Sequence, residues 1–160
     1  MKGMNENLVL LRRYGGDILS SEGMRSQRAF PQHGGVSVYA HSVTVALMCL
    51  KLARALRLRV DDRALVRGAL LHDYFLYDWH VKDAAHRWHG FTHPARALAN
   101  ARRDFGVGPI EADMIACHMF PLVPRMPRCR ESALLCAADK LCALRETLGR
   151  RRVKKSLRGY

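Results

Sequence analysis

Histidine and aspartate residues recur along the chain where helix-like stretches should turn an apolar face to the core. His72 follows Ala-Leu-Leu, His118 follows Met-Ile-Ala-Cys, and Asp139 follows Leu-Leu-Cys-Ala-Ala. Burying several such ionisable groups without partners costs several kcal/mol each. A shared cation removes this cost, because neutral imidazoles and carboxylates become its ligands. The pattern predicts a metal site, and its candidate residues are His41, His72, Asp73, His93, His118 and Asp139.

The ligand types narrow the class of metal and leave its identity open. Imidazole and carboxylate ligands without thiolates suit iron, manganese, zinc, cobalt or nickel. Asp73 directly follows His72 and is placed to bridge two ions. The five cysteines contain no Cys-x-x-Cys pair and are interpreted as structural thiols in apolar helical patterns.

Helices must position these residues, because apolar residues recur at three- and four-residue intervals and no alternating strand pattern is found. Asp61 is a candidate helix cap, Pro94 suits a first helical turn, and Gly106 suits a helix end. The expected fold is an all-α bundle of about five core helices with one or two peripheral helices in residues 1–30. The expected core helices are 37–56, 61–72, 94–105, 109–120 and 130–149.

The bulk composition predicts one domain, residues 1–149 with a core at about 35–146, followed by a basic tail at 150–160. The net charge is +13, and the tail is expected to be a solvated segment that aids solubility, with nucleic acid, acidic lipid or an anionic substrate as alternative contacts. The sequence contains no apolar run of membrane-spanning length and no signal-peptide pattern, so a cytoplasmic protein is expected.

The order of His41, the His72-Asp73 pair and Asp139, with local sequences ALLHD and AADKL, resembles the HD-domain superfamily of metal-dependent phosphohydrolases. The resemblance covers about residues 35–146. It implies that His41, His72, Asp73 and Asp139 hold one metal, and that Asp73 also reaches a second.

His93 and His118 are similar to the extra histidines of dinuclear HD members, which implies a two-metal site. The spacings are 21 residues from His72 to His93, 25 to His118 and 21 to Asp139, so each allows one helix and a turn. His89 lies four residues before His93 and takes its place as ligand if the third helix begins earlier than Pro94 suggests.

Further residues are candidates for contacts with a substrate. The connection 74–92 is rich in histidine and aromatic residues, which suits a pocket wall. It contains His80, His86 and Trp79, with His89 as a candidate acid, although an aromatic satellite core is an equal interpretation of the tryptophans. Lys140 follows Asp139 and is a candidate phosphate contact, as is Arg125 in the proline-rich connector after His118.

The expected activity is hydrolysis of a phosphoester of a nucleotide or another small phosphorylated compound. The same ligand set also resembles the HD-fold mixed-valence di-iron oxygenases, which are the first alternative. A non-catalytic HD binding module whose tail contacts nucleic acid is the second.

Overall fold

Helices make up nearly all of the regular structure. The computed structural model describes residues 2–32, 35–81 and 88–157, and within these ranges it contains helices and one isolated bridge but no strand. The helices are α1 (Lys2–Ser20), α2 (Glu22–Ser26), α3 (Val38–Ala55), α4 (Asp62–Leu71), α5 (His89–Phe105), α6 (Pro109–Cys117) and α7 (Arg130–Leu157). The all-α prediction is confirmed. None of the helices in the described ranges is long and apolar enough to cross a membrane.

Helices α3 and α4 begin and end close to the predicted positions, and side-chain caps explain where they begin. The Ser37 side chain accepts a hydrogen bond from the backbone N–H of Ala40, and the Asp61 side chain accepts one from that of Ala64. Helix α4 ends at Leu71 with His72 as its C-cap residue. The helix therefore ends at His72, and the next residue is Asp73, which is also buried.

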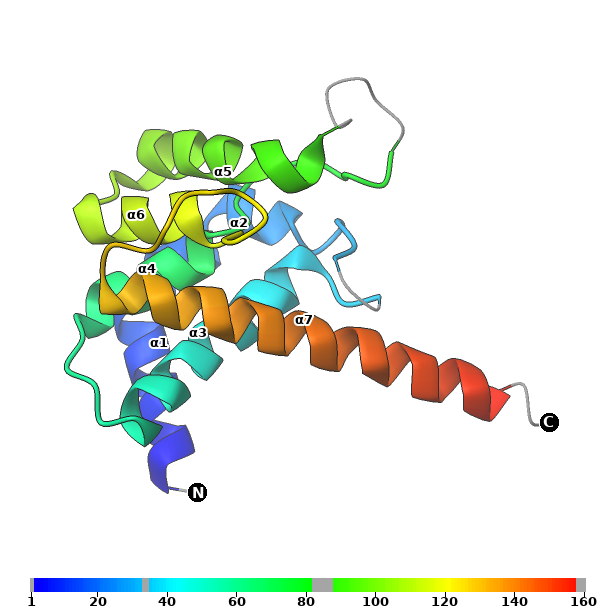
Figure 1. Ribbon diagram of the computed structural model, residues 1–160, viewed down its shortest axis with the longest axis horizontal. Helices are drawn as coiled ribbons and strands as arrows, with labels where there is room; N and C mark the ends of the chain where they lie inside the picture. Colours follow the sequence, from blue (N-terminus) through cyan, green and yellow to red (C-terminus); the bar gives the residue numbers. More distant parts are fainter. Residues whose placement is uncertain (1, 33–34, 82–87, 158–160) are drawn as a thin grey trace.

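The core lies where α3 and α4 pack together and where α6 and α7 cover them (Figure 1). Leu50, Leu65 and Leu135 are almost completely buried there. The two N-terminal helices contribute to the same core through Ile18 and Met24, which are both fully buried. These helices are thus part of the packed bundle and hold the segment before α3 against it.

Gly68 allows α4 and α6 to approach closely. A Cβ atom added at Gly68 would lie 2.5 Å from Sδ of Met114. We expect Gly68→Val to lower the free energy of unfolding by about 1–3 kcal/mol, because extra volume in a packed helix contact forces side chains and backbone to shift. Urea denaturation measures this, with Gly16→Val as the matched control, since a Cβ atom there would meet nothing within 4 Å. Equal losses of unfolding free energy in Gly68→Val and Gly16→Val would contradict a close approach of α4 and α6 at Gly68.

Helix α5 begins at His89, five residues before the predicted start at 94. The backbone carbonyl of Trp88 accepts hydrogen bonds from the N–H groups of Phe91 and Thr92, so the first turn forms without a side-chain cap. Pro94 therefore lies in the second turn. His89 and His93 consequently lie one turn apart, with ring centroids 4.5 Å from each other.

Helix α6 ends at Cys117, three residues before the predicted end at 120, and His118 is its C-cap residue. Helix α7 does not end at Gly149 as predicted but continues to Leu157, and its C-terminal part extends beyond the bundle (Figure 1). Glycine permits a left-handed helix end without imposing one, and the arginine and lysine residues that follow favour helix. Most of the segment expected to be a tail is therefore helical.

Candidate metal centre

Five helices bring the six predicted ligands to one place. His41 lies on α3, His72 caps α4 and Asp73 follows it, His93 lies on α5, His118 caps α6, and Asp139 lies on α7. All six are buried, with at most 8% of each residue exposed. Their donor atoms form two groups, His41 with His72 and Asp73, and Asp73 with His93 and His118, in which the atoms lie within 4.8 Å of one another. Asp73 is common to both groups.

The four histidines present the same ring nitrogen to the centre. Nδ1 of His72, His93 and His118 each lies 2.8 Å from a backbone carbonyl, those of Ala69, His89 and Ile115 respectively. A carbonyl only accepts, so Nδ1 carries the proton in all three rings. The fourth ring, His41, has Nδ1 2.9 Å from Oε2 of Glu146. The Nε2 atoms are left to face the centre, which is the arrangement of metal-ligating histidines whose other nitrogen is held by an acceptor.

The two carboxylates lie between these Nε2 atoms. Oδ1 of Asp73 is 3.2 Å from Nε2 of His93 and 3.5 Å from that of His118, and Oδ2 is 3.3 Å from Nε2 of His72. Oδ1 of Asp139 is 3.0 Å from Nε2 of His41 and 3.7 Å from that of His72. Asp73 thus contacts histidines of both groups, whereas Asp139 belongs to the side of His41 and His72.

The polar atoms of the centre fit a cation better than they fit one another. Nε2 of His93 and Nε2 of His118 are only 2.8 Å apart, although the Nδ1 proton leaves a lone pair on each. Nε2 of His72 and Oδ1 of Asp73 are buried without a hydrogen-bond partner among the described residues. Unpaired buried acceptors are costly, and a divalent ion at each group would satisfy all of them.

The electrostatics of the metal-free centre depend on its histidines. Burial lowers the pKa of His41, but hydrogen bonds to Asp139 and Glu146 outweigh it and raise that pKa to about 9. Burial raises the pKa of Asp139, and the contacts with His41 and His72 outweigh it and hold that pKa well below its usual range. Burial dominates at His118 and lowers its pKa, which favours the neutral form that binds metals.

Residues that sequence reasoning missed hold the ligands in place. Glu146 bonds to His41 from α7, and Gln32, in the segment before α3, donates from Nε2 to Oδ2 of Asp73. Gln27 donates to the backbone carbonyl of Asp73. Glu146 lies seven residues after Asp139, two turns along the same helix face, and this spacing was a usable signal. No periodicity relates the two glutamines to Asp73.

We expect Glu146→Gln to weaken metal binding about 10- to 100-fold, because an acceptor that orients a ligating histidine also raises its basicity. A chelator competition titration measures the affinity. Arg145→Gln, an exposed neighbour on the same helix, is the control and should leave the affinity unchanged. An unchanged affinity in Glu146→Gln would show that His41 does not depend on this carboxylate.

The aromatic connection after Asp73 packs beside the centre. His89 lies outside both groups, with Nδ1 2.8 Å from the Tyr77 hydroxyl and its ring stacked on His93 and Trp79. Trp79 donates from Nε1 to Oε1 of Gln32, the residue that also bonds to Asp73. His80 is exposed and lies 3.2 Å from Asp78, and His86 falls outside the described residues.

A pocket of about 470 Å³ opens beside the centre, between α7 and the connector that follows α6. Asp139 and Lys140 are its polar residues, and its apolar lining consists of Met119, Pro121, Leu122 and Ala143. Lys140 donates from Nζ to the backbone carbonyls of His118 and Cys136. These bonds use two of the three ammonium protons. Arg125 lies instead in a second pocket, which contains none of the six cluster residues.

Comparison with known proteins agrees with this geometry. A family model described as the HD domain matches residues 38–144, a range that contains all six residues of the cluster. No protein of curated function and no solved structure matches the chain. The HD domain defines a superfamily of metal-dependent hydrolases. Since the match covers most of the chain, this protein belongs to the HD-domain family.

Proposed function

We propose that the protein is a metal-dependent phosphohydrolase that hydrolyses a phosphoester of a nucleotide or another small phosphorylated compound. One observation supports this proposal most strongly. Asp73 lies between two groups of histidines and contacts Nε2 atoms of both groups. His41, His72, Asp73 and Asp139 would hold one divalent ion, and Asp73, His93 and His118 a second. When bound, such ions supply Lewis acidity to a phosphoryl oxygen and acidify a water molecule.

The chain's own residues orient the centre and its substrate. Glu146 and Gln32 fix the ring of His41 and the carboxylate of Asp73. The pocket beside Asp139 has a volume within the range of small-molecule sites. Lys140 in its lining offers a positive charge to a phosphate, and Met119, Pro121 and Leu122 offer an apolar surface to the rest of the substrate.

The aromatic connection is the proposed wall for the rest of the substrate. Trp79 packs on both His80 and His89, so its indole is part of a stacked group of rings. His89 is the ring of this group that also contacts His93. We therefore assign to His89 a contact with the substrate or its leaving group, and to Trp79 the positioning of that ring.

Phosphate release from metal-loaded protein tests the proposal. Protein stripped of metal is loaded in turn with Mn²⁺, Co²⁺, Fe²⁺, Ni²⁺ or Zn²⁺ and given p-nitrophenyl phosphate and the nucleoside 5′-monophosphates. Release with at least one metal, lost on addition of chelator and restored by that metal, is expected. A folded, metal-loaded protein that releases no phosphate from any of these compounds would contradict the proposal.

A second candidate is supported by the composition of the cluster, which contains four histidines and two aspartates and so resembles the HD-fold di-iron oxygenases. The requirement for O2 distinguishes phosphoester hydrolysis from the oxygenase reaction. Turnover with Mn²⁺ or Co²⁺ under anaerobic conditions supports the phosphohydrolase. Turnover that requires iron and consumes O2 supports the oxygenase.

A further inference from the structure

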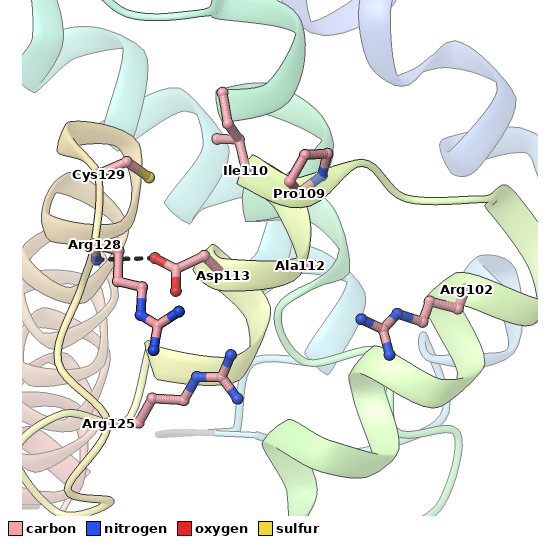
Figure 2. A pocket seen from close by; sticks show the side chains of 8 residues that line it. All are labelled: Arg102, Pro109, Ile110, Ala112, Asp113, Arg125, Arg128 and Cys129. Atoms are coloured by element: carbon pink, nitrogen blue, oxygen red, sulfur yellow. Dashed lines mark hydrogen bonds between the residues drawn. The ribbon is translucent and has the colours of Figure 1, made fainter.

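A second pocket, of about 400 Å³, lies between the C-terminal part of α5, the first turns of α6 and the connector that leads to α7. Figure 2 shows the side chains that line it. They are Arg102, Pro109, Ile110, Ala112, Asp113, Arg125, Arg128 and Cys129. None of these residues belongs to the metal centre or to the pocket beside it.

Three arginine side chains give this pocket an excess of positive charge. In Figure 2 the guanidinium groups of Arg125 and Arg128 lie near each other on the connector side, and that of Arg102 lies across from them on α5. The ion pairs found within the described ranges engage other arginines, and no carboxylate of the described residues forms an ion pair with these three groups. Three cations against the single carboxylate of Asp113 leave a formal excess of two positive charges.

Asp113 holds the connector and does not pair with the guanidinium groups. Its Oδ2 accepts hydrogen bonds from the backbone N–H of Arg128, at 2.9 Å, and from the Ser132 hydroxyl, at 2.7 Å. These bonds tie the end of the connector to the middle of α6. Arg128 is therefore positioned by its backbone while its side chain stays available to a ligand.

The opposite wall suits the apolar part of a ligand. Pro109 and Ile110 are the first residues of α6, which begins after Gly108 without a side-chain cap. Cys129 contributes no negative charge, because burial raises the pKa of its thiol and outweighs the contact with the Ser132 hydroxyl, which lowers it.

We propose that this pocket is a second binding site, which takes the phosphoryl group of a small organic phosphate on Arg102, Arg125 and Arg128 and rests its apolar part on Pro109 and Ile110. The planar guanidinium group presents paired donors that match phosphoryl oxygens, and the excess of two charges matches a phosphate monoester dianion. The connector runs from this site to Leu122 in the lining of the pocket beside the metal centre.

Calorimetric titration with phenyl phosphate tests the site in full-length protein kept in EDTA, at constant ionic strength. The chelator removes metal from the centre, so the test does not depend on the proposed hydrolysis. The double variant Arg125→Gln/Arg128→Gln is compared with Arg12→Gln/Arg25→Gln, which removes the same charge from exposed positions on α1 and α2. We expect the first pair to weaken binding at least about tenfold and the second less than about twofold.

Three results would overturn the proposal. Equal weakening in the two double variants would show that net charge attracts the ligand without a site. Loss of phenyl phosphate binding in Asp73→Ala, while the arginine variants bind normally, would place the ligand at the metal centre. Binding of a single-stranded oligonucleotide that depends on Arg125 and Arg128, with no binding of phenyl phosphate, would identify a nucleic-acid contact instead.

Discussion

We expect Asp73→Asn to lose metal from both groups of the centre and to lower the rate of the proposed phosphoester hydrolysis more than about 100-fold. The reason is that Asp73 is the one residue present in both groups, and the asparagine side chain keeps its size but loses the negative charge. Loss of a residue that merely supports a ligand already costs about 10- to 100-fold, so loss of a shared ligand costs more. Metal content per chain and phosphate release, measured on the same preparations, check this result.

Asp62→Asn is the matched control for Asp73→Asn. Asp62 lies at the first turn of α4, at the opposite end of the helix that delivers His72. Its replacement leaves metal content and rate unchanged. A wild-type rate in Asp73→Asn would show that the reaction does not require the Asp73 carboxylate.

We expect the metal-free protein to lose stability as the pH rises through about 9, because protonated His41 contributes to that stability. The metal-loaded protein should not show this loss. Hydrogen bonds to Asp139 and Glu146 raise the pKa of His41 to about 9 from an ordinary value of 6.5. A group whose pKa is higher in the folded state contributes stability that is fully present below 6.5 and disappears above 9. The contribution is on the order of 3 kcal/mol, which corresponds to a change in Tm on the order of 10 °C for a chain of this size.

Thermal unfolding between pH 6 and pH 10, with and without metal, measures this effect. His41→Gln is the control, because lysine, tyrosine and cysteine groups also titrate in the alkaline range and change stability in both proteins. The expected result is a steeper loss in the metal-free wild type than in metal-free His41→Gln. Parallel curves for the two proteins would contradict the assigned role of His41.

The six clustered residues could be predicted from the sequence as candidate metal ligands because each one interrupts the apolar face of a helix or follows its end. His72 was expected at a helix end and His118 two residues before one, and both are C-cap residues in the structure. Asp61 was a correct start signal, since its side chain caps α4. Local rules sufficed here because cap residues and apolar periodicity act within a few residues of the chain.

The start of α5 and the end of α7 were predicted wrongly for a physical reason. Pro94 favours a first helical turn, but packing of His89 and His93 against Phe75 accompanies an earlier start. Gly149 does not adopt the left-handed conformation that ends α5 at Gly106. The start of α5 depends on Phe75, which lies outside the local segment, whereas α7 continues because the residues after Gly149 favour helix.

The residues that support the ligands were the hardest to predict. Gln32 lies 41 residues before Asp73 along the chain, and Glu146 lies 105 residues after His41. Only the packing of α7 against α3, and of the segment before α3 against the cluster, brings them together. Sequence periodicity reports the face of one helix and does not report which distant polar group meets it.

The metal content of wild-type protein, purified without chelator above pH 7, tests the central claim most directly. Elemental analysis should find a transition metal at about two ions per chain, since neutral imidazoles and ionised carboxylates are the metal-binding forms. His93→Gln should lose one of these ions, because His93 belongs to only one of the two groups. A folded wild-type protein that contains no transition metal, and takes up none when it is supplied, would contradict the assignment of this cluster as a metal centre.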